Sequence, residues 1–168
     1  MEIRDANGMT EEEFVAVYKT KNYPRPYLTA DVVVFDKEGK VLLIKRKGHP
    51  FLGKFAFPGG FVNPDETVEE AASRELMEET GLSDIAIRHV GIYSKPGRDP
   101  RGWIVTSAYT AKLSEDVKAQ AGDDAAEAIW FELQIEGDKI TLRSENLCFD
   151  SAELAFDHDD VLRDALRI

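Results

Sequence analysis

The sequence predicts one α/β domain, an α/β/α sandwich in which a mixed β-sheet lies between helices. The first observation is length, because 168 residues of which 43% are hydrophobic suit a single core. The second is a series of short runs rich in β-branched and aromatic residues, from "LTADVVVF" to "AIWFEL". The third is a helical pattern in the middle of the chain and another at its C-terminal end, which together supply a helix for each face of the sheet.

In the N-terminal part of the chain, residues typical of helix ends and turns mark where each element begins and ends. In "TEEEFVAVYKT", Thr10 and Glu13 have the spacing of a capping box, which predicts a short helix in an extension of about residues 1–25. The prolines of "YPRP" end it. "LTADVVVF" and "KVLLIKRK" are predicted to form a hairpin through "DKEG", and "KFAFPGGFV" a strand that runs into a Gly-rich turn.

The second half of the chain predicts three more strands and a helix. "DIAIRHVGIYSKP" and "WIVTSAYTAKL" read as strands joined by the turn formers of "GRDPRG", and "AIWFEL" as another strand. The tail "SAELAFDHDDVLRDALR" has apolar residues at helical spacing.

Composition narrows the class of protein. Cys148 is the single cysteine, so an internal disulfide is impossible, and we expect a buried thiol. No apolar run is long enough to span a bilayer, and the acidic N-terminus lacks the apolar region of a secretory signal, so we expect a cytoplasmic protein. The net charge of −11 argues against a nucleic-acid binder that works by neutralising phosphates.

The segment "GGFVNPDETVEEAASRELMEETGL", residues 59–82, concentrates acidic residues on one predicted helix. Thr67 and Glu70 form a second capping box at its start, and Gly81 is placed to end it as a left-handed cap. Glu69 and Glu70 suit the positive end of the helix dipole, so a solvated acidic face accounts for them.

Three other carboxylates of this helix, Glu75, Glu78 and Glu79, need a different explanation. They fall on or beside the apolar face, where like charges repel and burial is costly unless the charge is neutralised. That face is marked by Val68, Ala72 and Leu76. A hard divalent cation such as Mg²⁺ resolves the conflict, because it binds clustered carboxylates and leaves sites for water and phosphate oxygens. The cation also lets an acidic protein hold an anionic substrate.

The same segment resembles the Nudix box of the Nudix hydrolases. All nine specified positions of the box are filled: Gly60, Glu66, Arg74, Glu75, Leu76, Glu78, Glu79, Gly81 and Leu82. The order of strands around it is also similar, so the resemblance implies the Nudix fold and a single Nudix hydrolase domain over residues 1–168. It further implies hydrolysis, with Mg²⁺ or Mn²⁺, of a nucleoside diphosphate linked to another moiety.

The resemblance assigns roles to the residues of the box. Glu78 and Glu79 are expected to bind the metal, Glu75 to bind it or to activate water, and the backbone carbonyl of Gly60 to add a ligand. The remaining polar pair, Glu66 and Arg74, is expected to hold the loop and helix in shape.

A general base outside the box is expected by analogy with family members that carry it in a loop before a late strand. The corresponding loop is "AGDDAAEAIWF", where Glu127 is the first candidate and Asp124 the second. A solvated acidic loop without a catalytic role is the alternative for both residues.

The predicted substrate is ADP-ribose, cut to AMP and ribose 5-phosphate. Pro96 stands 15 residues after Gly81, and this spacing together with "YSKPGRDPRGW", "GDDAAEAIWF" and "AFDHDDVLRDAL" resembles ADP-ribose-cleaving members. Arg98 and Arg101 are expected to bind phosphate or ribose oxygens. Three aromatic residues are candidates for stacking on adenine, each with a place in the core as the alternative: Phe57, Tyr93 and Trp103. The histidines at 49, 89 and 158 receive no role.

Two alternatives to this substrate remain open at this point. One is a Nudix enzyme for an oxidised nucleotide, a dinucleoside polyphosphate or a nucleotide sugar. The other is a non-catalytic ADP-ribose sensor that controls transcription, which the intact box, the acidic charge and the end of the chain at Ile168 disfavour. We expect a small nucleotide as ligand, no nucleic-acid or membrane partner, and a homodimer as in related enzymes.

Overall fold

The computed structural model describes residues 3–115 and 125–168, and within these ranges nine strands form one sheet. The helices are α1 (Glu11–Lys19), α2 (Val68–Thr80), the 3₁₀ turn η1 (Ser151–Glu153) and α3 (His158–Ala165). The strands are β1 (Tyr27–Phe35), β2 (Val41–Arg46), β3 (Phe55–Ala56), β4 (Gly59–Phe61), β5 (Arg88–Tyr93), β6 (Ile104–Lys112), β7 (Ala125–Glu136), β8 (Lys139–Arg143) and β9 (Cys148–Asp150).

The sheet is mixed, as predicted. Its strands follow the order β5-β6-β1-β2-β7-β8-β9, with β3 beside β2 and β4 beside β1. β1 and β6 run parallel over their whole length, whereas β1 pairs with β2 and with β4 in antiparallel fashion. The predicted hairpin is confirmed, since the "DKEG" turn that joins β1 to β2 is closed by the Gly39 N–H, which donates to the Asp36 carbonyl.

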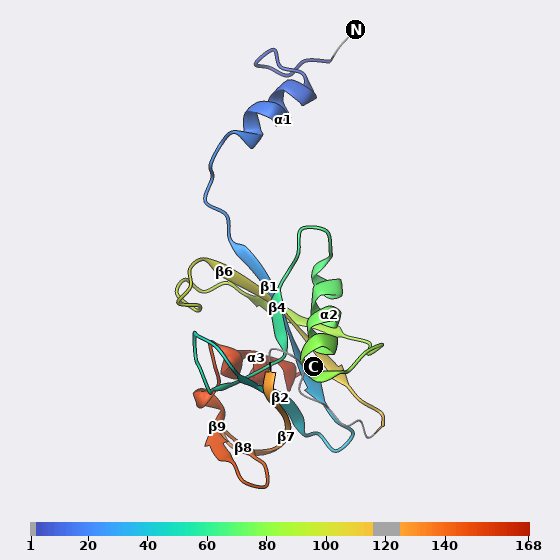
Figure 1. The fold of residues 1–168 in the computed structure, drawn as a ribbon, viewed down its shortest axis with the longest axis vertical. Helices are drawn as coiled ribbons and strands as arrows, with labels where there is room; N and C mark the ends of the chain where they lie inside the picture. The colour runs from blue at the N-terminus through green and yellow to red at the C-terminus, as the bar shows by residue number, and fades with distance from the viewer. Residues whose placement is uncertain (1–2, 116–124) are drawn as a thin grey trace.

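Helices cover both faces of the sheet, so the predicted α/β/α sandwich is confirmed (Figure 1). Side chains alternate between the faces along β1, because successive residues of a strand point to opposite sides. Ala30, Val32 and Val34 pack in the cluster that contains α2. Val33 and Phe35 pack in the cluster that contains α3.

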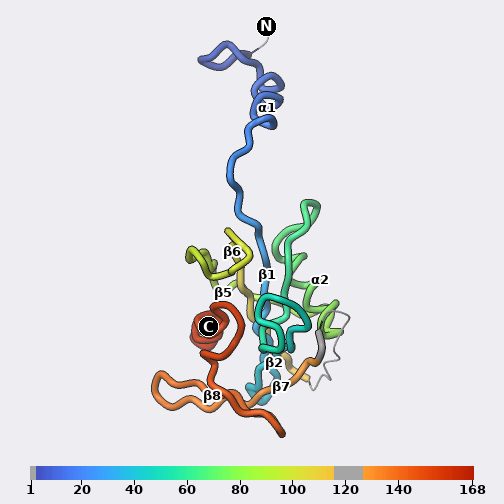
Figure 2. The backbone as a smooth tube through the Cα atoms, turned by 60° about the vertical axis from the view of Figure 1, so that its left-hand side comes forward, coloured from blue at the N-terminus to red at the C-terminus, as the bar shows by residue number. Residues whose placement is uncertain are grey.

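The predicted ends of α1 and α2 are confirmed. Thr10 and Thr67 each close a capping box at the N-terminal end of their helix, and Gly81 ends α2 with φ of 73°. The two helices differ in their surroundings. α2 packs on the sheet, whereas α1 stands away from the body of the domain on an extended arm and has no buried residue (Figures 1 and 2).

Three expectations were wrong. Cys148 is exposed rather than buried, because it begins the short strand β9, which the sequence did not reveal. The C-terminal helix is shorter than the apolar spacing predicts and begins at His158, since Phe156 has φ of 56°, a left-handed conformation that a helix does not accommodate. Glu127 lies within β7 rather than in the loop before it, and Asp124 lies outside the described residues.

In the described ranges, no helix is long and apolar enough to cross a membrane.

Candidate active site

Two glycines bring β4 and α2 into close contact. The Gly59 N–H donates to Oε2 of Glu79 at 2.9 Å, which holds this carboxylate against the strand. A Cβ atom on Gly60 would overlap the carboxylate of Glu75, and one on Gly59 would overlap the Asp31 carboxylate and the Ala30 carbonyl. Only glycine therefore allows the β4 backbone to pass between these acidic side chains.

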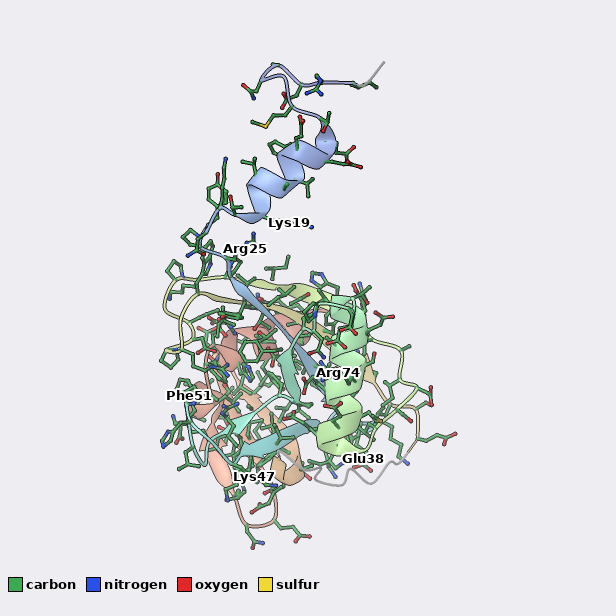
Figure 3. All side chains as sticks on the ribbon, turned by 45° about the horizontal axis from the view of Figure 1, so that its top comes forward. Lys19, Arg25, Glu38, Lys47, Phe51 and Arg74 are labelled. Atoms are coloured by element: carbon green, nitrogen blue, oxygen red, sulfur yellow. The ribbon has the colours of Figure 1, made fainter. Side chains whose placement is uncertain are left out.

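Arg74 is the centre of an ion-pair network between α2 and the loop that follows β4. Its place on α2 is labelled in Figure 3. It binds both carboxylate oxygens of Glu66, donates to Oε1 of Glu75 at 2.7 Å and lies 3.2 Å from Oε2 of Glu78. Its Nη2 also donates to the Phe61 carbonyl at 3.0 Å. One guanidinium thus ties the end of β4, the following loop and the middle of α2 together.

Burial changes the acidity of the carboxylates around the glycines. It raises the pKa of Glu79 to about 8 and the pKa of Asp31 to about 7. Burial also raises the pKa of Glu75, against the opposing effect of Arg74. Without a bound cation, negative charge at these positions is therefore energetically costly. A bound cation would remove that cost.

The oxygen atoms of the predicted ligands are of the kind that bind a hard divalent cation, although these residues do not converge on one point. Carboxylate oxygens and backbone carbonyl oxygens are the kind of ligands that Mg²⁺ prefers. Among the described residues, no three acidic, histidine or cysteine side chains converge into a site able to hold a metal. Two of the predicted ligands, Glu75 and Glu78, instead accept hydrogen bonds from Arg74.

A polar pocket, called here the Asp31 pocket, opens beside Gly59 and Gly60. Its floor contains the buried side chains of Asp31, Thr106 and His158. Its rim contains Arg46, Arg101 and the Phe156 ring, with both guanidinium groups stacked over that ring at 4.9 and 5.7 Å.

The two predicted substrate arginines differ in accessibility. Both line the Asp31 pocket. The Arg98 side chain is only 3% exposed, and it donates from Nε to Asp157 at 2.7 Å and from Nη1 to Thr106 at 2.9 Å. The Arg101 side chain is 39% exposed, is held by Asp99 and lies 5.0 Å over the Phe61 ring. Arg101 is thus presented at the surface, whereas Arg98 supports the floor.

The three predicted stacking residues do not come together. Phe57 is 1% exposed and stacks on His158, with 5.0 Å between ring centroids, so its ring offers no open face to a base. The Tyr93 hydroxyl donates to Asp164 at 3.0 Å, in a groove beside α3. Trp103 is exposed in another groove, which also contains Pro96.

Glu127 occupies a groove of its own. Its Oε1 accepts from Lys45 at 3.4 Å, and neither residue lines the Asp31 pocket. Its neighbour Ala128 and then Trp130 pack in the cluster that contains α2, so the alternation of side chains turns Glu127 away from that helix. The fold does not bring Glu127 to the carboxylates of α2.

Sequence reasoning missed several residues of the Asp31 pocket, including Asp31, Arg46, Phe156 and His158. One signal was present, because Asp31 is the single charged residue inside the apolar run of β1. No comparable signal marked His158, which lies far along the chain and reaches the pocket only through the packing of α3.

Comparison with known proteins settles the family. The NUDIX domain family matches residues 25–146, most of the chain. The chain belongs to the Nudix family. Its box carboxylates and its similarity to a pyrophosphatase place it among the Nudix pyrophosphohydrolases.

Three Nudix relatives are informative. The chain is 42% identical to the ADP-ribose pyrophosphatase of Methanocaldococcus jannaschii, over 89% of this chain and 78% of that protein. It resembles the crystal structure of a MutT/nudix family protein from Enterococcus faecalis, with a TM-score of 0.80, 40% identity and coverage of 95% and 69% of the two chains. It also resembles the NUDIX domain of Shewanella oneidensis NrtR complexed with ADP ribose, with a TM-score of 0.74, 32% identity and coverage of 95% and 98%.

Proposed function

We propose that this Nudix hydrolase cleaves ADP-ribose to AMP and ribose 5-phosphate. The observation that carries the proposal is the 42% identity to an ADP-ribose pyrophosphatase over most of both chains. Two further observations support it: a similar NUDIX domain was crystallised with ADP ribose, and the Asp31 pocket opens directly beside Gly59 and Gly60.

The proposed metal ligands are Glu78, Glu79 and the carbonyl of Gly60, with Glu75 as either a further ligand or the group that activates water, and the proposed ion is Mg²⁺ or Mn²⁺. When bound, the ion offsets the diphosphate charge and lowers the pKa of a bound water. The protein's own part is to hold Glu79 against the Gly59 N–H and to keep Glu75 beside Gly60. Glu66 and Arg74 fix the loop that presents both groups.

For the general base we propose Glu75, with Glu127 as the second candidate. Glu75 is half-buried, lies against Gly60 and has a raised pKa, which brings a carboxylate closer to the pKa useful for accepting a proton near neutral pH. Glu127 remains a prediction from the sequence. Its exposure and its ion pair with Lys45 do not favour it over Glu75.

Among the predicted substrate residues, we propose that Arg101 binds a phosphate oxygen. It is accessible at the rim of the Asp31 pocket, and its Asp99 partner and the Phe61 ring orient the guanidinium. Arg98 is proposed to orient the floor through Thr106 rather than to touch phosphate. Trp103 and Tyr93 remain candidates for contact with adenine, because each lines an open groove.

A substrate panel tests the proposal. ADP-ribose, an oxidised nucleoside triphosphate, a dinucleoside polyphosphate and a nucleotide sugar are each incubated with the protein, with Mg²⁺, with Mn²⁺ and with a chelator. We expect ADP-ribose to have the highest kcat/KM, with AMP and ribose 5-phosphate as products and no turnover in the chelator. A higher kcat/KM for any other substrate would overturn the substrate assignment and leave the hydrolase class intact.

A second function is supported by the resemblance to NrtR's NUDIX domain, whose structure was determined with ADP ribose. In that case the protein would bind ADP-ribose and release no products. The same panel separates the two functions when calorimetry is added, because a sensor shows binding without turnover.

We further propose that the protein forms a homodimer through the N-terminal arm. Phe14 and Tyr18 stack on each other along α1, Tyr23 lies beside Tyr18, and all three rings are exposed. Exposed apolar patches of this kind mark interaction surfaces. A second copy is the proposed partner, since paired arms would cover each other's rings.

A further inference from the structure

Asp31 and His158 face each other across a gap in the floor of the Asp31 pocket. The distance from Oδ1 of Asp31 to Nε2 of His158 is 3.9 Å, which is too long for a hydrogen bond. Both residues are buried, and both line the pocket. They come from opposite ends of the chain, Asp31 from β1 and His158 from the start of α3.

The hydrogen bond at Nδ1 of His158 determines whether its other ring nitrogen, Nε2, carries a proton. Nδ1 accepts from the backbone N–H of Phe57 at 3.0 Å. Nδ1 is therefore unprotonated, and the proton of the neutral ring lies on Nε2. The floor thus offers one N–H donor, from His158, and one carboxylate acceptor, from Asp31.

A hydroxyl group matches this pair. A hydroxyl can donate to Asp31 and accept from His158 at the same time, whereas a phosphate oxygen only accepts and an ammonium group only donates. An oxygen about 2.8 Å from both atoms spans the gap with an angle of about 90° at that oxygen, a reachable geometry. Thr29 and Thr106, whose hydroxyls are 2.5 Å apart, add polar atoms beside this position.

The charge of the lining residues differs between the floor and the rim of the pocket. Asp31 disfavours phosphate at the floor, where the Arg98 guanidinium is already paired with Asp157. At the rim, Arg46 and the exposed Arg101, the latter paired with Asp99, favour it. A ligand that carries a phosphate next to a hydroxylated group fits this order. The cavity volume of about 70 Å³ accommodates a small polar group such as one sugar ring.

We propose that the Asp31 pocket is the subsite for the sugar phosphate beyond the scissile diphosphate, with a sugar hydroxyl between Asp31 and His158 and its phosphate at Arg101. This assignment rests on the proposed hydrolysis of ADP-ribose and deepens it. It adds Asp31 and His158 as specificity-determining residues, of which His158 lies beyond the NUDIX match at residues 25–146.

Calorimetry in chelator tests the subsite without turnover or metal. The ligands are ribose 5-phosphate, ethyl phosphate, which has no hydroxyl beyond the phosphate, and AMP. The proteins are the wild type, Asp31→Asn and the control Asp84→Asn, since Asp84 is exposed in the loop after α2 and does not line the pocket.

We expect the wild type to bind ribose 5-phosphate at least about tenfold more tightly than ethyl phosphate or AMP. Asp31→Asn should lose most of that preference, a loss of about tenfold, because its amide oxygen still accepts a hydrogen bond but is a weaker acceptor than the charged carboxylate. Asp84→Asn should keep the preference. If Asp31→Asn fails to fold, which its thermal unfolding would reveal, the ligand series on the wild type decides alone.

Three outcomes would overturn the subsite. The first is equal binding of ribose 5-phosphate and ethyl phosphate by the wild type, as expected if only water occupies the gap. The second is an unchanged preference in folded Asp31→Asn. The third is tightest binding of AMP, which would assign the pocket to the nucleotide. Failure of the proposed function is visible separately, as absence of ADP-ribose hydrolysis by the wild type in Mg²⁺.

Discussion

Arg74 donates two hydrogen bonds to Glu66, from Nε to Oε2 at 2.9 Å and from Nη2 to Oε1 at 2.6 Å. Glu66 also accepts from the Asn63 N–H at 2.7 Å, so one ion pair closes the loop between β4 and α2. The pair lowers the pKa of Glu66 to about 2. The same guanidinium also donates to Glu75 and Glu78, so this ion pair and the box carboxylates of α2 belong to one network.

Arg74→Lys should loosen this loop, because a lysine cannot form the two parallel hydrogen bonds of a guanidinium. We expect a loss of about 2 kcal/mol in the free energy of unfolding, measured by urea denaturation, and a fall in ADP-ribose hydrolysis. The control is Arg167→Lys, whose side chain is 75% exposed and pairs with Asp164 near the C-terminus. Equal effects of the two substitutions would contradict a special role for Arg74.

Glu79→Gln should separate activity from stability. The substitution keeps the shape of a side chain that is buried against Gly59, and it removes a charge that burial disfavours. Thermal unfolding in chelator should therefore be unchanged or shifted to higher temperature, while Mg²⁺-dependent hydrolysis falls by orders of magnitude. Full activity in this variant would remove Glu79 from the proposed metal ligands.

Glu75→Gln and Glu127→Gln compare the two candidate bases. We expect Glu75→Gln to lower kcat by about 10² or more, the usual contribution of general base catalysis. Glu127→Gln should change kcat by only a few-fold, since Glu127 is exposed and paired with Lys45. Steady-state kinetics with ADP-ribose measure both. The reverse order, with the larger loss in Glu127→Gln, would restore the base predicted from the sequence.

His158 should make the protein sensitive to acid. Burial lowers the pKa of His158 from 6.5 to about 3, so its neutral form is favoured in the folded protein. Its contribution to stability is present above pH 6.5 and is lost as the pH falls from 6.5 toward 3, by up to about 1.4 kcal/mol per pH unit. Urea denaturation between pH 7 and 4.5 should show a shallower pH dependence in His158→Gln than in the wild type.

His89→Gln is the matched control for this pH dependence, since His89 is exposed on β5. It should follow the wild-type curve. A control curve as shallow as that of His158→Gln would show that the acid sensitivity arises elsewhere.

Replacement of Phe14 and Tyr18 by serine should turn the proposed dimer into a monomer. These rings stack on α1 and have no buried neighbour on that helix, so the substitution should not unfold the domain. Light scattering after size exclusion measures the mass, and circular dichroism checks the fold. A wild-type protein that is already monomeric at tens of micromolar would exclude the dimer.

Local sequence signals were sufficient for most elements. The capping boxes at Thr10 and Thr67 and the left-handed cap at Gly81 were readable because each depends on residues a few positions apart. Strands β8 and β9 and the late start of α3 were not predicted. Phe149 of β9 packs on Phe55 and Phe131, and the left-handed Phe156 packs on Phe51. These contacts are with distant parts of the chain, which no local pattern encodes.

The features of the candidate site also divide into those that local sequence predicts and those that only the tertiary structure shows. The sequence by itself determined the α/β class, the box and the carboxylates of α2, because helical periodicity and the dense spacing of the box lie within one segment. Only the tertiary structure decided that Arg98 is buried behind Thr106, that Glu127 faces away from α2 and that Asp31 meets His158. The first and third relations arise where β1, the "GRDPRG" turn and α3 meet, and the second arises from the alternation of side chains along β7. Side chains remote in the chain become neighbours only when the hydrophobic core brings their backbones together.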